Sequence, residues 1–445
     1  MAFKDYPAPS RRNVLQLGGG LLGAAALSGL PRSAAAAERP IGTWPAGSAG
    51  ESVYVGINLP RTGSYQLPGG DELKGYELAL EHLNAGHALI RAMAPKVTKG
   101  LLGKRVDHGV ADTEAKPNVA VQAASRFISE NKAVMFTGSC SSAVAVALNK
   151  LAQREKVIYL PGVSGSNDTT GKDCTRYSFR TCFYGQTSSA ALAPTLIKTY
   201  GKNKKVAFLT PDYTYGHTVQ KSMLEYLSKG GWTMVSNQVS PLGTADFSSY
   251  LLNVGNSGAD VVVNINWGND AFSSVKQAAQ FGILKRMKMA VAYQVPFLAK
   301  EVTPELTQGM LAATDFWWTL ADKYPLAKMF VDEFHKKYGY NPQWAAEAGY
   351  MQIACWARMV SEAGTFYPPA VIKEYEKGEH FNSLVGDVWF RPQDHQLVRP
   401  VFIVRGKAPA QMKAPDDYWE VIETAPGEPL MQAPDAFGCK LGPYV

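Results

Sequence analysis

The sequence predicts an α/β protein built of two similar doubly wound lobes with mostly parallel sheets, joined by a hinge of several strands. Strand-like and helix-like segments alternate in two successive series, over about residues 52–160 and 205–292. The two series are similar in length and rhythm. Polar and aromatic motifs follow the strands, where open α/β sheets bind ligands.

The first series begins with the alternating segment Ser52–Leu59 and contains helices whose apolar residues recur at helical spacing. Its predicted strands are Ser52–Leu59, Val106–Ala111, Ala133–Phe136 and Lys156–Leu160, and its predicted helices are Asp71–Asn84, Pro117–Glu130 and Val144–Leu151. A further short strand is predicted at Tyr177–Arg180.

The second series follows the same rhythm after a helix at Gln186–Tyr200. Its predicted strands are Lys205–Thr210, Trp232–Val239, Asp260–Ile265 and Lys288–Ala292, with helices ending at Lys229, Val254 and Phe281. Beyond it, helices are predicted at Pro325–Tyr338 and Trp344–Gly364, and strands at Val385–Phe390 and Val401–Val404.

This organisation predicts five parts of the chain. Residues 51–183 with 315–388 form the first lobe, and residues 184–314 with 389–405 form the second. Residues 406–445, rich in Pro, Ala and Gly, form a tail that packs on the surface. The remaining parts are residues 1–37 and a linker over residues 38–50.

Residues 1–37 are expected to be an export signal. The pair Arg11-Arg12 precedes the mildly apolar run Leu17–Leu30, which is too short to span a bilayer, and Ser33–Ala37 offers a small-residue cleavage site. The pattern resembles a twin-arginine signal, with a Sec signal as the alternative. The mature chain is therefore expected to begin near Glu38, outside the cytoplasm, with the twin-arginine export machinery as a partner.

Composition excludes several function classes. The net charge of +7 is spread thinly, without a basic block, so no nucleic-acid partner is expected. Five cysteines are present, and the close spacing of Cys174 and Cys182 predicts a disulfide between them, which an exported protein permits. Neither Cys nor His residues show metal-ligand spacing, so the prediction includes no metal and no cofactor.

The stretch Met135–Ser142 reads as a buried strand, a tight turn and the start of a helix. The free N–H groups of such a helix start attract anions and the oxygens of polar solutes, so Ser141 and Ser142 are predicted to bind ligand. An ordinary βα turn with a serine cap is the alternative for this stretch taken alone.

Other predicted ligand-binding residues lie in loops at strand ends. Hydroxyl and carbonyl groups would orient the polar end of a small solute, and aromatic side chains would bury the rest of it. The predicted set comprises Ser141, Ser142, Gly162, Ser164, Tyr65, Tyr215, Trp267 and Tyr293. For Tyr215 and Trp267, packing in the core is the alternative.

Motifs of catalysis are absent from the sequence: the order Gly162-Val163-Ser164-Gly165 is not a nucleophile elbow, and there is no P-loop and no H-E-x-x-H. The chain is therefore predicted not to be an enzyme.

At these loops the chain resembles the periplasmic solute-binding proteins that include the leucine/isoleucine/valine-binding proteins and the amide and urea receptors. The likeness runs from about Ser52 to Val404 and rests on motifs in the right order. They are Thr62-Gly63 with Gly75, Gly138-Ser139-Cys140-Ser141-Ser142, Pro161-Gly162-Val163-Ser164, Tyr215-Gly216, Asp246-Phe247-Ser248, Asp260 before Trp267, and Asp394-His395-Gln396.

The resemblance implies roles for single residues. Ser141 stands where the family donates a hydroxyl to a carboxylate, Gly162 where it supplies a carbonyl, and Ser164 where it supplies a second hydroxyl. Tyr215 and Trp267 stand at the aromatic positions of the second lobe. The family's acid that holds an α-ammonium group would lie near Tyr293-Gln294, and neither residue is acidic.

The resemblance therefore implies a monomeric periplasmic receptor that delivers a small polar solute to the permease of an ABC importer. The solute is an amino acid, a short amide, urea or a carboxylate. Two rival functions remain: a ligand-sensing regulator with the same lobes, and an exported hydrolase that uses Ser141 or Ser164.

Overall fold

The computed structural model describes residues 46–444. The predicted export signal and most of the predicted linker lie outside the described residues. Among residues 46–444, no helix is both long and apolar enough to cross a membrane.

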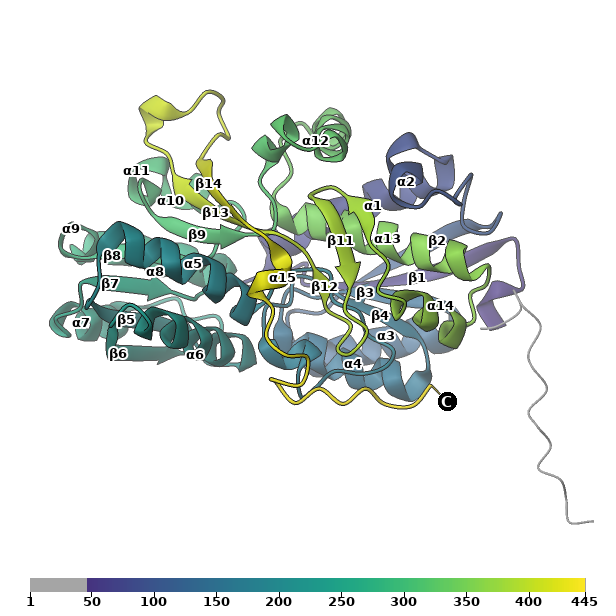
Figure 1. The fold of residues 1–445 in the computed structure, drawn as a ribbon, viewed down its shortest axis with the longest axis horizontal. Coiled ribbons are helices and arrows are strands. Elements are labelled where there is room, and N and C mark those ends of the chain that lie inside the picture. The colour runs from purple at the N-terminus through teal and green to yellow at the C-terminus, as the bar shows by residue number, and fades with distance from the viewer. Residues whose placement is uncertain (1–45, 445) are drawn as a thin grey trace, which may run out of the picture. The chain divides into compact units, whose positions relative to one another are not determined.

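The first lobe is built on a four-stranded parallel sheet in the order β2-β1-β3-β4. Its strands are β1 (Ser52–Leu59), β2 (Arg105–Asp112), β3 (Met135–Gly138) and β4 (Ile158–Pro161). Helices α1 (Gln66–Ala85) and α13 (Trp344–Ala363) pack together on one face, and α3 (Pro117–Ser129) and α4 (Ser142–Glu155) cover the other (Figure 1). Strands β3 and β4 and most of β1 are thus buried, as expected of parallel strands, while the edge strand β2 is largely half-buried or exposed.

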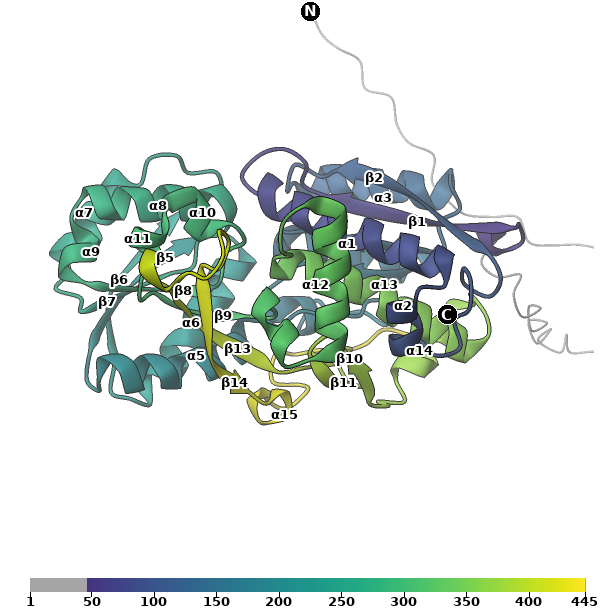
Figure 2. The same cartoon turned by 90° about the horizontal axis from the view of Figure 1, so that it is seen from above.

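The lobe is completed by helices α2 (Ala88–Met93), α12 (Pro325–Tyr338) and α14 (Pro368–Tyr375). A small antiparallel sheet contains β10 (Phe381–Ser383), β11 (Gly386–Phe390) and β12 (Leu397–Val398). These elements follow the second lobe in the sequence, so the chain returns to the first lobe to finish it (Figure 2).

The second lobe contains a seven-stranded sheet in the order β14-β13-β9-β8-β7-β5-β6. Its strands are β5 (Lys205–Pro211), β6 (Thr233–Ser240), β7 (Val261–Asn264), β8 (Lys288–Tyr293), β9 (Leu311–Thr314), β13 (Val401–Gly406) and β14 (Trp419–Ala425). The five strands β5 to β9 are parallel, and β13 and β14 are antiparallel to their neighbours. The order β6-β5-β7-β8 repeats the order β2-β1-β3-β4, which confirms the prediction of two similar doubly wound lobes.

Helices flank this second sheet. They are α5 (Gly185–Tyr200), α6 (Thr214–Ser228), α7 (Ser248–Asn256), α8 (Gly268–Gln280), α9 (Ile283–Arg286), α10 (Leu298–Val302), α11 (Pro304–Thr307) and α15 (Gly427–Leu430). Short 3-10 helices lie at Ala46–Ser48, Asn167–Thr170, Trp318–Asp322 and Pro409–Gln411.

Two segments differ from the predicted strand pattern. Tyr177–Arg180 makes only isolated bridges, Ser178 with Tyr159 and Arg180 with Gln396, because it runs along the sheet edge into the connection between lobes. The tail after Gly406 is not wholly irregular, since β14 pairs with β13 along six residue pairs and extends the second sheet. Strand β14 lies at the edge of the sheet, and Trp419 is the one buried residue among its seven.

Three crossings between the lobes meet at a buried ion cluster. Arg399, between β12 and β13, lies 3.2 Å from Asp315 at the end of β9 and 3.0 Å from Glu347 in α13. Both oxygens of Asp315 also accept from the Phe183 N–H, at 3.1 and 3.0 Å, on the third crossing. The side chains of Arg399, Asp315 and Glu347 are at most 1% exposed. This cluster ties the hinge strands together.

The disulfide predicted between Cys174 and Cys182 is wrong. Cys174 is bonded to Cys439 near the end of the tail, which runs from α15 back across the first lobe (Figure 1). Residues 175–181 carry Cys182 away from Cys174 into the base of the interlobe site, where its thiol donates to the Gly162 carbonyl at 3.4 Å. Closeness in sequence failed here because the intervening chain is extended.

The Cys439→Ser variant is therefore expected to lose about 2–5 kcal/mol of stability, since the bond closes a loop of 265 residues in the unfolded chain. Urea unfolding of the variant and of the wild type, with and without reductant, measures this loss. Reductant should lower the wild type to the level of the variant and leave the variant unchanged. A stable variant, or a Cys174–Cys182 peptide in a non-reducing digest, would contradict the assignment.

Candidate functional site

The turn between β3 and α4 is held in a strained shape. Gly138 and Ser139 both have positive φ, 101° and 113°, and Ser139 is not a glycine. The Gly138 carbonyl accepts from the Tyr159 hydroxyl at 2.8 Å and from the Gly162 N–H at 3.0 Å. A side chain at Gly138 would lie 2.3 Å from the Asn58 carbonyl oxygen. Neighbouring strands therefore fix the direction in which the turn presents the start of α4.

The start of α4 has hydrogen-bond donors to offer. Ser141 is the N-cap residue, yet its side chain makes no capping bond, and its buried Oγ has no partner among the described residues. The first intrahelical bond runs from the Ala145 N–H to the Ser141 carbonyl at 2.9 Å. The preceding N–H groups of the helix therefore have no intrahelical acceptor, and they give this end a partial positive charge.

The loop after β4 lies beside this helix start. Ser142 Oγ is 3.2 Å from the Ser164 hydroxyl and accepts from the Ser166 N–H at 3.1 Å. The buried Arg180 fixes the loop after β4 in place, because it donates to the carbonyls of Ser164 at 3.0 Å and Ser166 at 2.5 Å. No sequence motif pointed to Arg180, whose other partners are the side chains of Thr170 and the distant Gln396.

Aromatic side chains form the opposite wall. Tyr215 at the start of α6, Trp267 before α8 and Tyr293 at the end of β8 come from the second lobe, and Trp344 at the start of α13 joins them from the first. Ring centroids are 5.3 Å apart for Tyr215 and Tyr293, and 5.2 Å apart for Trp267 and Trp344. The Tyr215 hydroxyl and the Trp267 indole N–H are buried without a partner among the described residues.

The lobes are closed on each other in this structure. A cavity of about 10 Å³ lies between them, lined by Cys140, Ser142, Val163, Gly165, Tyr213, Tyr215, Trp267, Tyr293 and Trp344. Hydrogen bonds cross between the lobes from Tyr65 Oη to Tyr213 Oη at 2.9 Å and from the Asn269 N–H to the Ser64 carbonyl at 2.9 Å. The lobes must part before a solute larger than a water molecule can enter.

The structure brings the eight predicted residues to this region in different ways. Ser142, Tyr215, Trp267 and Tyr293 line the cavity. Ser141 is buried next to it, and the Ser164 hydroxyl bonds within the first lobe to Ser142 and Thr169. Gly162 lies behind the lining residue Val163, and Tyr65 contacts Tyr213 at the rim.

Sequence reasoning missed five lining residues: Cys140, Val163, Gly165, Tyr213 and Trp344. Four of them adjoin predicted motifs and could have been included. Gly165 has to be a glycine, because a side chain there would lie 2.4 Å from the Tyr293 ring. The Tyr293 hydroxyl donates to the Gly165 carbonyl at 3.0 Å. No sequence motif marked Trp344 as a lining residue, because it lies at the start of an apolar helix, far along the chain from the predicted motifs.

No acidic side chain lines the cavity among the described residues. Asp270, in the first turn of α8 after Trp267, accepts from the Gly243 N–H at 2.8 Å, and burial raises its pKa to about 6. The position beside Tyr293 is Gln294, whose side chain donates to the Val295 carbonyl at 3.0 Å. The cavity is therefore rich in donors and lacks an anion that could pair with an ammonium group.

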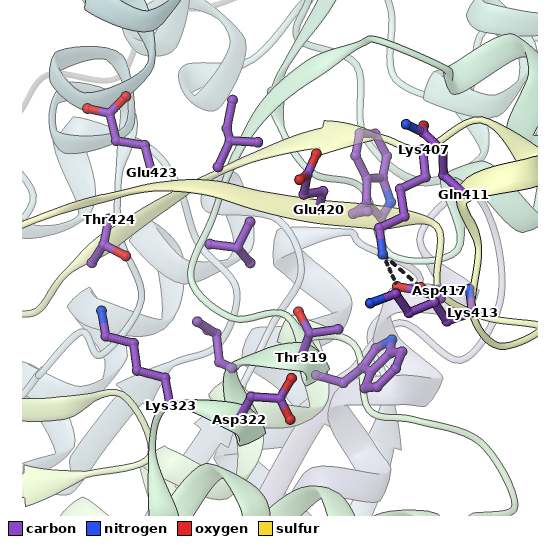
Figure 3. A pocket seen from close by; sticks show the side chains of 15 residues that line it. Thr319, Asp322, Lys323, Lys407, Gln411, Lys413, Asp417, Glu420, Glu423 and Thr424 are labelled. Atoms are coloured by element: carbon purple, nitrogen blue, oxygen red, sulfur yellow. Dashed lines mark hydrogen bonds and ion pairs between the residues drawn. The ribbon is translucent and has the colours of Figure 1, made fainter.

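A larger groove of about 660 Å³ lies between the Trp318–Asp322 helix and β14 (Figure 3). Its charged groups partly satisfy one another: Lys407 donates to both oxygens of Asp417, at 2.6 and 2.7 Å. None of its lining side chains has a buried polar atom without a partner. It is an open surface feature, and we place the functional site between the lobes.

His82, His87 and Glu333 also come together, with candidate ligand atoms within 4.8 Å of one another. The two imidazole rings are stacked, with centroids 3.8 Å apart, so their in-plane lone pairs run parallel and do not converge on one point. The Nδ1 atom of His82 lies 2.9 Å from the Tyr350 hydroxyl, and that of His87 accepts from the Leu89 N–H. We assign no metal to this cluster.

Comparisons with known proteins agree with the two-lobed architecture. A family model described as "Periplasmic binding protein" matches residues 52–411. The Leu/Ile/Val-binding protein homolog 7 of Brucella abortus is 25% identical over 308 residues, which cover 67% of this chain and 74% of that protein. An amino acid ABC transporter substrate-binding protein from Pseudomonas fluorescens superimposes with a TM-score of 0.78 at 25% identity, covering 88% of this chain and all of that one.

Proposed function

Since this chain belongs to the periplasmic binding protein family, we propose that it captures a small carboxylate between its two lobes. Solute reception for an ABC transporter is the function of the relatives, and this chain is such a receptor. The choice of a carboxylate over an amino acid, an amide or urea is our inference from the site.

The observation that carries the proposal is the set of unpaired donors between the lobes. Ser141 Oγ belongs to the first lobe, and the Tyr215 hydroxyl and the Trp267 indole N–H belong to the second. Buried polar groups need partners, and an indole N–H can only donate. The oxygens of a carboxylate accept such bonds, and the start of α4 adds a favourable field for negative charge.

The same site disfavours a free amino acid. An ammonium group enclosed here would face aromatic rings and donors without an acidic partner in the cavity lining. A buried charge left unpaired costs several kcal/mol. The aromatic walls instead suit a flat apolar body, and benzoate combines such a body with one carboxylate.

We also propose the molecular context. Residues 51–183 with 315–398 form one moving lobe, and 184–314 with 399–425 form the other, because β11 and β12 pair with β10 while β13 and β14 extend the second sheet. Ligand capture follows hinge closure, and the permease recognises the closed form. The receptor is a monomer, it is exported by the twin-arginine machinery, and it has no catalytic role.

A thermal-shift screen tests the proposal. The panel contains benzoate, benzamide, leucine, valine, urea and acetate, and each mixture is analysed for products. Benzoate is expected to raise the melting temperature without turnover, because binding to the folded state alone stabilises it. A larger shift with leucine than with benzoate would contradict the carboxylate assignment, and hydrolysis of an amide or ester would contradict the receptor.

The Ser141→Ala variant is expected to bind benzoate about 10- to 100-fold more weakly, because it loses a hydrogen bond to a charged group worth about 1.5–3 kcal/mol. Calorimetric titration measures this change. Ser189→Ala is the matched control, since Ser189 in α5 is also buried with an unpartnered hydroxyl but, unlike Ser141, has no lining residue on either side of it in the chain. Equal losses in the two variants would contradict the role of Ser141.

A further inference from the structure

Glu72 lies directly behind the two loops that would hold the solute. It belongs to α1 and is fully buried. Its Oε2 accepts from the Cys140 thiol at 3.2 Å, and its Oε1 accepts from the Tyr76 hydroxyl at 2.9 Å. Cys140 lines the interlobe cavity and directly precedes Ser141.

The carboxyl group also touches the second loop. A side chain at Gly162 would lie 2.2 Å from Glu72 Oε1, so only a glycine fits between this carboxyl group and the loop. The backbone of Val163, another lining residue, donates a hydrogen bond to Glu72. A single acidic side chain thus supports both the β3–α4 turn and the loop after β4 from the side opposite the cavity.

The groups that face Glu72 supply no positive charge. They are Asp71 and Tyr76 on α1, Cys140 in the turn and Tyr159 on β4, while α13 presents the uncharged Gly349 and Gln352. Arg180, the buried cation near the second loop, bonds to the carbonyls of Ser164 and Ser166. Its positive charge is not among the largest interactions that set the pKa of Glu72.

We propose that Glu72 is the positioning residue that makes solute capture depend on charge: neutral, it supports the loops around a bound carboxylate, and ionised, it weakens that binding. This role of Glu72 rests on the proposed function, because it concerns the binding of a carboxylate between the lobes. Ionised Glu72 would place a negative charge beside Cys140, the residue that precedes the Ser141 donor. This charge would repel the carboxylate that the donors bind. A neutral carboxyl group of the same shape leaves the loops in place without this repulsion.

Burial supports this assignment, because it raises the pKa of Glu72 to about 8 despite the opposing hydrogen bonds. The group is thus neutral at pH 7 and ionises as the pH rises through 8. Burial raises the pKa of both Tyr76 and Cys140 well above their usual values, so these neighbours keep their protons in the same range. The pKa of Asp71 is about 6, so it is already ionised at pH 8.

The test is calorimetric titration of benzoate into the wild type, Glu72→Gln and Asp71→Asn between pH 6.5 and pH 9.5. The wild-type affinity is expected to be constant below pH 8 and to fall towards tenfold per pH unit above it. Glu72→Gln has the shape of the neutral acid and should bind equally well at all these pH values. Asp71→Asn removes an adjacent charge that helps to raise the pKa of Glu72, so it should keep the wild-type slope while the fall begins at a lower pH.

Benzamide gives the control for charge, since a neutral amide should lose much less affinity in the wild type above pH 8. A melting curve of each protein at each pH identifies any loss that comes from unfolding. A benzoate affinity that does not change with pH, or an equal fall in Glu72→Gln, overturns the role of Glu72 and leaves the carboxylate receptor standing. Failure of benzoate to bind at every pH overturns the proposed carboxylate and this inference together.

Discussion

Replacing Arg399 with methionine is expected to destabilise the protein by about 3–5 kcal/mol, because it leaves two buried carboxylates without their cation. Asp315 and Glu347 have no measurable side-chain exposure, and Arg399 bonds to both. The Phe183 N–H and the Asp315 carboxylate would stay in contact, but the three crossings of the hinge would lose their common partner. Urea unfolding measures the change.

The effect should also depend on pH. Burial and the neighbouring Glu347 raise the pKa of Asp315 to about 7, although the positive charge of Arg399 lowers it. Because the pKa of Asp315 is raised in the folded state, stability is lost as the pH rises from about 4 to about 7. Without Arg399 the folded-state pKa rises further, so the variant keeps losing stability above pH 7. Arg399→Met is therefore expected to lie further below the wild type at pH 9 than at pH 6.

Arg405→Met is the matched control, since the exposed pair of Arg405 and Glu420 lies in the same sheet. An exposed pair of this kind is worth about 0–1 kcal/mol. If Arg399→Met costs no more than Arg405→Met, the buried cluster does not hold the hinge.

The Trp267→Ala variant is expected to weaken benzoate binding by about 2–4 kcal/mol, roughly 30- to 1,000-fold. It removes both a wall and an unpaired donor. Large buried aromatic side chains dominate binding free energies because they fill well-packed, dehydrated sites. Calorimetric titration measures the affinity, and a melting curve establishes that the variant is folded.

Trp318→Ala is the control that separates the two cavities. Trp318 lines the open groove beside β14 and is not among the residues that line the interlobe cavity. Its loss should leave benzoate affinity unchanged. An effect of Trp318→Ala without an effect of Trp267→Ala would move the solute site to the groove.

Local patterns predicted the architecture because each βα unit carries its own signals. The strand β1 was predicted at its exact bounds, and α12 likewise, since apolar alternation or helical spacing ends at clear turn residues. The strand β9 was missed. Its sequence, Leu-Ala-Ala-Thr, has no alternation and too little β-branching to separate it from a helix end.

The site could be predicted only in part, for a related reason. Ser142, Tyr215 and Trp267 follow strands in sequence, so the rule that ligands bind at strand ends finds them. Arg180, Trp344 and the pairing of Cys174 with Cys439 depend on segments that meet only when the chain has crossed between lobes. Glu72 looked like an ordinary helix-surface acid, and only tertiary packing buries it behind the turn.

Capture of a carboxylate between the lobes can be tested by calorimetric titration of benzoate into the wild type and Trp267→Ala at pH 7. We expect one site per chain in the wild type, with affinity lost in the variant. Equal affinity in both proteins would contradict capture between the lobes. Heat from leucine or urea, with none from benzoate, would contradict the carboxylate.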